Sequence, residues 1–94
     1  MIVTIQVTEQ DIQHGLAGDC QKCPVALAIY RALPELGVRV GTGGVTLYRG
    51  DIFAVVPLPL PVPGFIARFD HDLVDGPFSF DLDVPDEIVP AGAS

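Results

Sequence analysis

Apolar and polar residues alternate in two stretches, one early and one late in the chain. The first covers residues 3–7 and the second covers residues 78–84. A period of two residues is typical of a strand with one face in the core and the other in water. In the second stretch the side chains expected to face the core are Phe78, Phe80, Leu82 and Val84, and those expected to face water are Ser79, Asp81 and Asp83. A shift of one residue would exchange the two faces, so this register has little ambiguity.

A long apolar segment between these stretches predicts a central helix. Residues 25–33 are rich in good helix formers and are apolar on almost every side. Cys23 and Pro24 open this helix, because proline is tolerated at the first helical position, where no hydrogen bond within the helix is lost. We expect the helix to stop at Pro34 and to be closed by Gly37.

Four smaller elements complete the expected fold. They are a short polar helix or turn capped by Thr8, a hairpin at residues 38–47, a strand at residues 52–56 and a second helix at residues 64–69. Asp11, three residues after Thr8, is expected to supply negative charge to the start of the first of these. This order of elements indicates an α+β fold: a mainly antiparallel sheet packed on one central helix plus a short second helix.

Residues 57–63 alternate proline with an apolar residue. The prolines remove alternate backbone donors and hold the chain near the polyproline II conformation, which excludes a central strand. The favoured interpretation is a rigid connector under which Leu58 and Leu60 pack. A ligand for an SH3 or WW domain is the alternative, because those domains bind exposed proline-rich segments.

The length of 94 residues suits a single domain with one modest core. We expect that domain to cover residues 1–85, followed by a flexible acidic C-terminal tail at residues 86–94. No apolar run approaches the roughly 18 residues that span a bilayer, and the N-terminal residues have no basic segment followed by a long apolar one. These features predict a cytoplasmic protein with no membrane partner.

The formal charge is distributed unevenly along the chain. Residues 1–69 hold five acids and five bases, whereas residues 70–94 hold seven acids and no Lys or Arg, which accounts for the whole net charge of −7. A one-sided acidic field selects basic partners and disfavours direct binding to nucleic acid or to anionic membranes. The side chains expected to bind a partner are Asp70, Asp72, Asp75, Asp81 and Asp83.

The last two of these carboxylates lie on one strand face. Strand geometry places Asp81 and Asp83 about 6.5–7 Å apart, which is close to the spacing of successive phosphates along a nucleic-acid strand. Such a face can meet Lys and Arg in a basic groove, with fast and salt-sensitive association. The alternative is that the negative face only keeps a small domain soluble.

The motif Cys20-Gln21-Lys22-Cys23-Pro24 has three chemical interpretations. A redox site would use a Cys23 thiolate stabilised at the helix start, although no strand is expected to precede the motif as in thioredoxin-like proteins. A zinc site would need two further ligands, for which the chain offers His14, His71 and nearby carboxylates such as Asp19, in spacings that match no common finger or ribbon. The favoured interpretation is that Cys20 and Cys23 are structural thiols that pack around the helix start. No residue pattern predicts a catalytic group, a metal or a cofactor.

Several motifs resemble a group of small uncharacterised proteins encoded by bacteriophages and prophages. The resemblance covers most of residues 3–82. It is carried by Val7-Thr8 through Asp11-Ile12, by Gly18-Asp19-Cys20 with Cys23-Pro24-Val25-Ala26-Leu27-Ala28, by Phe65-Ile66 to Phe69-Asp70, and by Pro77-Phe78-Ser79-Phe80. It transfers no active site and implies a mobile-element setting. In that setting short acidic proteins are often inhibitors of host machinery, including anti-CRISPR proteins. The resemblance therefore implies a non-enzymatic inhibitor that binds a basic, nucleic-acid-handling host protein, and a thiol-redox or zinc-binding protein is the alternative. A third interpretation is a subunit that assembles through the proline connector at residues 57–63 or through an open sheet edge.

Overall fold

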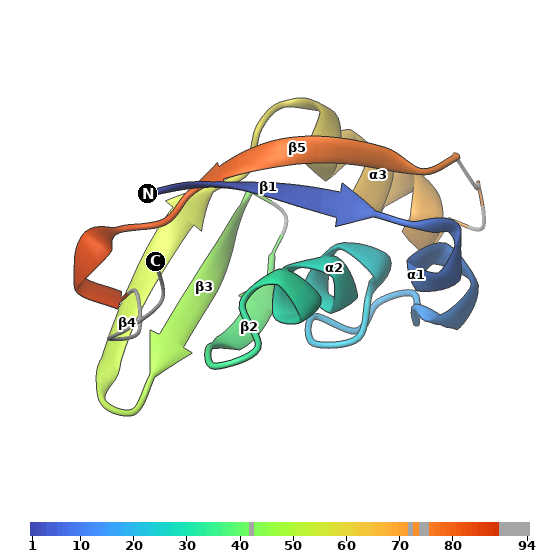
Figure 1. Ribbon diagram of the computed structural model, residues 1–94. Coiled ribbons are helices and arrows are strands. Elements are labelled where there is room, and N and C mark those ends of the chain that lie inside the picture. The colour runs from blue at the N-terminus through green and yellow to red at the C-terminus, as the bar shows by residue number, and fades with distance from the viewer. Residues whose placement is uncertain (42, 72, 74–75, 89–94) are drawn as a thin grey trace.

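The computed structural model describes residues 1–41, 43–71, 73 and 76–88, which form an α+β domain (Figure 1). Its elements in chain order are β1 (Ile2–Val7), α1 (Glu9–His14), α2 (Pro24–Ala32), β2 (Gly37–Val40), β3 (Gly44–Arg49), β4 (Ile52–Pro57), α3 (Pro61–Asp70), β5 (Phe78–Asp83) and the 3₁₀ helix η1 (Asp86–Ile88). Within those residues, no helix is long and apolar enough to cross a lipid bilayer. The fold class expected from the sequence is confirmed.

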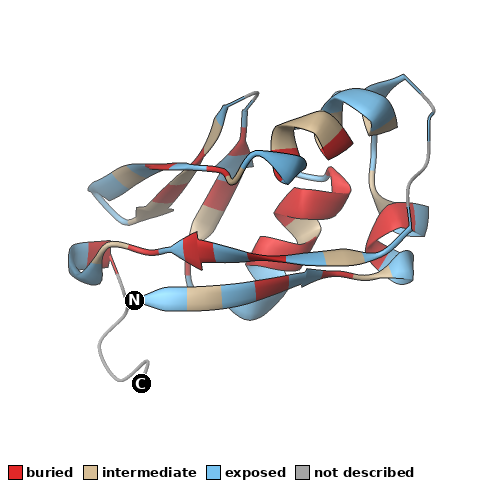
Figure 2. Ribbon diagram, turned by 90° about the horizontal axis from the view of Figure 1, so that it is seen from above, coloured by how far each residue is buried: buried red, intermediate tan, exposed pale blue. Residues whose placement is uncertain are grey.

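The strands divide into two antiparallel sheets instead of forming a single one. β1 pairs with β5 in a two-stranded ribbon, and β2, β3 and β4 form a three-stranded sheet in that order. Helix α2 packs against both β1 and β2, so it joins the two sheets. Figure 2 shows buried residues along this helix and, alternating with more exposed ones, along the strands.

The core contains the apolar residues that the alternating patterns place on the inner faces. Ile5 of β1, Leu82 of β5 and Leu47 of β3 are fully buried, as is Ile29 of α2. On β5 the alternation is the one expected, because Ser79, Asp81 and Asp83 are exposed while Phe80 and Leu82 are buried. Burial of one face fixes the register of this strand against β1.

The proline-rich segment becomes helical earlier than expected. Helix α3 begins at Pro61 instead of within residues 64–69, because a proline in the first helical turn loses no hydrogen bond. The N–H of Val62 donates to the carbonyl of Pro59 at 2.9 Å, and Val62 is fully buried. Leu58 is buried as expected, but Leu60 is 92% exposed, so the connector packs through only one of its two leucines.

Gly37 does not close helix α2, contrary to the expectation. The helix ends at Ala32 with Leu33 as its cap, and Gly37 is the first residue of β2. There it pairs with Tyr48 of β3, whose ring occupies the space that a Cβ atom at Gly37 would need. The glycine therefore serves close packing between strands and not a helix terminus.

The segment expected to be a C-terminal tail begins with ordered structure. Residues Asp86–Ile88 form η1, which packs against β3 and β4, and Ile88 is fully buried. The packed domain thus extends at least three residues beyond the boundary expected at residue 85. Residues 89–94 lie outside the described part of the chain.

Candidate functional site

The outer face of the β1–β5 ribbon carries the two strand carboxylates identified from the sequence. Asp81 lies opposite Thr4, and Asp83 lies opposite Ile2. The hydroxyl of Thr4 donates a hydrogen bond to the Asp81 carboxylate at 2.9 Å, which orients this side chain across the ribbon. All four residues are exposed, so the face combines the polar side chains of Thr4, Asp81 and Asp83 with the apolar side chain of Ile2.

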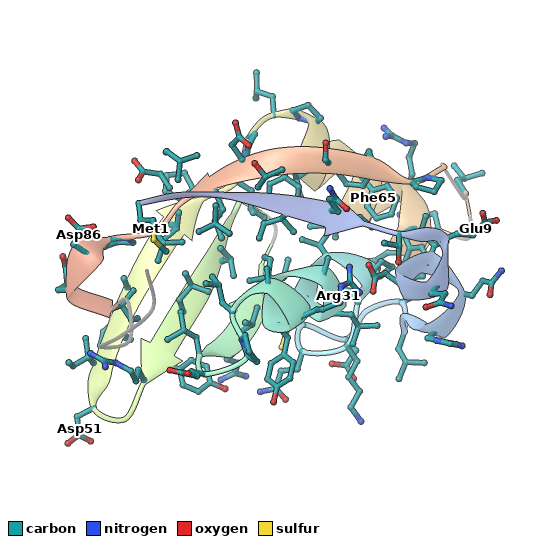
Figure 3. All side chains as sticks on the ribbon, in the orientation of Figure 1. Met1, Glu9, Arg31, Asp51, Phe65 and Asp86 are labelled. Carbon is teal, nitrogen blue, oxygen red and sulfur yellow. The ribbon has the colours of Figure 1, made fainter. Side chains whose placement is uncertain are left out.

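A third carboxylate joins these two at one end of the ribbon. The amino group of Met1 lies 3.7 Å from the carboxylate of Asp83 and 3.4 Å from that of Asp86. Figure 3 shows Met1 and Asp86 close together, with Glu9 at the opposite end of the molecule. We call Asp81, Asp83 and Asp86 the acidic end. Asp86 was expected in the tail, and its place beside Asp83 depends on the contact with Met1, which is distant in sequence.

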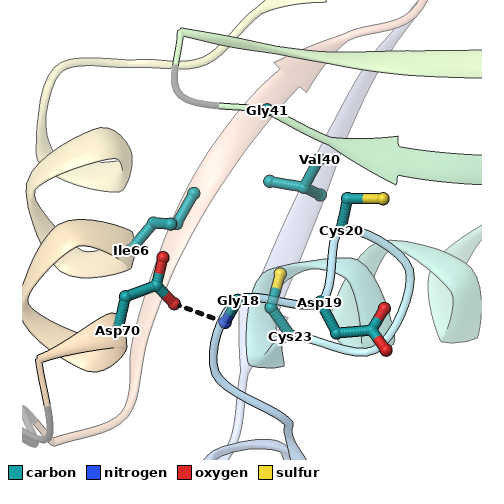
Figure 4. A pocket seen from close by; sticks show the side chains of 8 residues that line it. All are labelled: Gly18, Asp19, Cys20, Cys23, Val40, Gly41, Ile66 and Asp70. Atoms are coloured by element: carbon teal, nitrogen blue, oxygen red, sulfur yellow. Dashed lines mark hydrogen bonds between the residues drawn. The ribbon is translucent and has the colours of Figure 1, made fainter.

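Asp70, which was also expected to bind a partner, does not belong to this face. Asp70 lies at the end of α3, and its carboxylate accepts a hydrogen bond from the N–H of Gly18 at 2.9 Å. It therefore ties α3 to the loop before α2 (Figure 4). Asp72 and Asp75 lie outside the described residues.

Asp70 also lines a small pocket with both cysteines. The pocket has a volume of about 110 Å³ and is lined by Gly18, Asp19, Cys20, Cys23, Val40, Gly41, Ile66 and Asp70. The loop before α2 is built by backbone hydrogen bonds, and the Asp19 side chain accepts from the N–H groups of Gln21 and Lys22. The pocket is thus bounded by this loop, the end of β2 and one side of α3.

Cys23 is buried at the start of α2, where it is the N-terminal cap residue immediately before Pro24. Its sulfur accepts a hydrogen bond from the N–H of Ala26 at 3.4 Å, which caps the helix. Burial raises the pKa of the Cys23 thiol, and the backbone hydrogen bonds at the helix start only partly oppose this rise. The redox interpretation required a thiolate with a lowered pKa at this position, so the structure does not favour it.

Cys20 differs from its expected position because it is exposed and does not pack at the helix start. Its carbonyl accepts a hydrogen bond from the N–H of Val40 at 2.7 Å. Among the described residues, no three His, Cys, Asp or Glu side chains are grouped as a metal ion requires. The zinc site considered from the sequence, with His14 and His71 beside the two cysteines, is therefore not formed.

The chain matches no model of a protein family, no curated protein and no solved structure. The features that bear on function are those of its own surface. Carboxylates on the exposed face of a strand whose other face is packed in the core can accept hydrogen bonds from Lys and Arg. The acidic end therefore offers three exposed carboxylates as hydrogen-bond acceptors.

Proposed function

We propose that this chain is a non-enzymatic binding protein that presents its acidic end to a basic, nucleic-acid-handling host protein. One observation carries the proposal. Asp81 and Asp83 project from a strand whose other face is locked into the core by Leu82, which is fully buried between them in sequence. The two carboxylates are therefore held at a fixed spacing on a rigid support.

Rigidity matters because ordering flexible side chains costs free energy on binding. The hydrogen bond from Thr4 already orients Asp81, and Val84 is fully buried next to Asp83. A partner would meet two carboxylates whose backbone positions are fixed by the packed strand, one of them already oriented by Thr4. This arrangement favours specific recognition over a purely solubilising role of the charge.

The class of partner follows from charge and spacing. Spaced carboxylates on one strand face resemble the charges of a nucleic-acid backbone and suit a groove lined by Lys and Arg. The resemblance to phage and prophage proteins adds the setting, in which the partner is a host protein such as a CRISPR component and the chain acts as an anti-CRISPR-like inhibitor in the host cytoplasm. Asp72 and Asp75, in the segment before β5, remain part of this proposal.

Affinity capture from a host that carries a CRISPR system tests the proposal. The tagged protein is compared with the Asp81→Lys/Asp83→Lys variant and with a Glu35→Lys/Asp51→Lys control, which changes the net charge equally at two exposed sites elsewhere. We expect the wild type and the control to capture the same nucleic-acid-binding protein, and the Asp81→Lys/Asp83→Lys variant to lose it. Higher salt should weaken capture by the wild type.

Two results would contradict the proposal. Equal capture by both double variants would show that the position of the acidic end is irrelevant. Absence of any captured basic protein would leave the negative charge with a solubilising role only.

A further inference from the structure

Each of the two sheets has two outer strands, β1 and β5 in one and β2 and β4 in the other. Their open edges are protected to different degrees against pairing with a further strand. On β1, the carbonyl of Gln6 accepts a hydrogen bond from Arg31 Nη2 at 2.8 Å. On β2, the N–H of Val40 donates to Cys20, and β5 carries Asp81 and Asp83. Charges and hydrogen bonds of this kind prevent unwanted strand pairing.

β4 lacks these protections in the described structure. Its sequence Ile-Phe-Ala-Val-Val-Pro has no charged residue, and its side chains include two of the most exposed apolar residues of the protein. Phe53 is 69% exposed and Val55 is 67% exposed. An uncharged apolar edge strand of this length is a template for pairing with another strand.

The hairpin geometry shows which backbone groups β4 offers. Arg49 and Ile52 flank the two-residue turn at Gly50 and Asp51, and such flanking residues form a hydrogen-bonded pair. Hydrogen-bonded and non-hydrogen-bonded pairs alternate along an antiparallel ladder. The N–H and C=O groups of Phe53 and Val55 therefore point away from β3, toward the open edge.

We infer that β4 pairs with β4 of a second copy of this chain, joining the two three-stranded sheets into one of six strands. In the favoured antiparallel register, Phe53 lies opposite Val55 of the second copy, and Ala54 lies on the two-fold axis. Each Phe53 and Val55 pair then exchanges two hydrogen bonds, and an aromatic ring meets a β-branched side chain on the outer face.

Neighbouring registers are less favourable for identifiable reasons. A shift that places Val55 opposite its own copy brings Phe53 opposite Pro57, which has no N–H to donate. The opposite shift pairs Phe53 with its own copy and moves Val55 opposite Asp51 of the turn. Only the central register uses all the open backbone groups of Phe53 and Val55.

Charge favours β4 over β5 as the edge at which a second copy pairs. A chain with a net charge of −7 repels its own copies, so self-association needs a surface away from the acids. Residues 37–57 contain Arg39, Arg49 and Asp51 as their only formally charged side chains, so this part of the chain carries little net charge. Pairing through β4 brings this part of each copy together, whereas pairing through β5 would place Asp81 and Asp83 against their own copies.

Light scattering and sedimentation over a concentration range from about 10 μM to about 1 mM test the inference, since small interfaces are weak. We expect the wild type to form dimers as the concentration rises. Val55→Lys should raise the dissociation constant at least about tenfold, because it places two lysines at the paired edge. The matched control Leu60→Lys adds the same charge at a 92% exposed leucine outside β4 and should dimerise like the wild type.

A monomeric wild type at the highest concentration would overturn the inference and leave the edge to a strand from another protein. Unchanged dimerisation of Val55→Lys would also overturn it.

A second variant tests the register if Val55→Lys fails to fold. Ala54→Cys in a Cys20→Ser background should form a disulfide-linked dimer with oxidised glutathione, because cysteines in a non-hydrogen-bonded pair lie close enough to bond. The Leu60→Cys control should not, and equal cross-linking of both variants would contradict the register.

Discussion

Arg31 of α2 binds the carboxylate of Asp11 in α1 through two hydrogen bonds, from Nη1 to Oδ1 at 2.7 Å and from Nη2 to Oδ2 at 2.8 Å. Asp11 is the buried charged residue of the described structure and also accepts hydrogen bonds from the N–H and hydroxyl of Thr8. Arg31 donates in addition to the carbonyl of Gln6. This pair therefore fixes α1, α2 and β1 relative to one another, beneath the ribbon that carries the acidic end.

Replacing Asp11 should destabilise the protein in a pH-dependent way. Burial by itself raises the pKa of Asp11, but the hydrogen bonds from Arg31 and Thr8 outweigh burial and hold the pKa below its ordinary value. A carboxyl group with a lowered pKa stabilises the fold above its unfolded pKa of about 3.9, and this contribution is lost as the pH falls through the folded value. We expect Asp11→Asn to lower the free energy of unfolding by about 2 kcal/mol at neutral pH.

Urea denaturation at pH 7 and near pH 2 measures this effect. The difference between Asp11→Asn and the wild type should shrink at the lower pH, where the wild-type carboxylate is increasingly protonated. A difference that is the same at both pH values would contradict the role assigned to the ionised pair.

Ile88 should contribute to stability although the sequence assigns it to a tail. It is fully buried where η1 packs against β3 and β4. Ile88→Ala should lower the free energy of unfolding by about 2–4 kcal/mol, because it leaves a cavity in the core. Leu60→Ala, at an exposed leucine, should change it by less than about 0.5 kcal/mol. Equal effects of the two substitutions would show that η1 is not packed as described.

The two thiols should react at different rates. Cys20 is exposed, whereas Cys23 is buried and its thiol has a raised pKa. Titration of the native protein with a thiol reagent at neutral pH should modify one cysteine quickly and the second only on unfolding. The Cys20→Ser variant should lose the fast phase. A fast phase that persists in this variant would indicate an accessible, reactive Cys23.

Asp70 should matter for stability and not for partner binding through the acidic end. Its carboxylate binds the Gly18 N–H and so connects α3 to the loop before α2. Asp70→Asn should lower the free energy of unfolding by about 1 kcal/mol and leave partner capture unchanged. Loss of capture by a folded Asp70→Asn variant would place Asp70 back among the binding residues.

Local patterns were sufficient to predict those elements whose position and buried face depend on residues within the element itself. The alternation in β5 identifies its buried face, and Pro24 marks the start of α2, because burial and the proline ring act within each element. The proline-rich segment was only partly predictable. Pro61 and Pro63 are compatible with both polyproline II and a first helical turn. In the structure this segment is helical, and Val62 between the two prolines is fully buried.

The candidate site was predictable only where it lies on one strand. Asp81 and Asp83 share a face of β5 for local reasons, so the sequence could pair them. Asp70 and Asp86 take their positions from contacts with Gly18 and Met1, which are distant in sequence. The distribution of charge along the chain contains no information on such contacts. The prediction based on it therefore placed Asp70 with Asp81 and Asp83, and placed Asp86 in the tail.

The most direct test measures the affinity of the captured host protein for the wild-type chain, the Asp81→Lys/Asp83→Lys variant and the Glu35→Lys/Asp51→Lys control in competition with labelled nucleic acid. We expect the wild type and the control to displace the nucleic acid, and the Asp81→Lys/Asp83→Lys variant to bind at least about tenfold more weakly. Raising the salt concentration should weaken the wild type more than this variant. Equal displacement by all three proteins would contradict recognition through the acidic end.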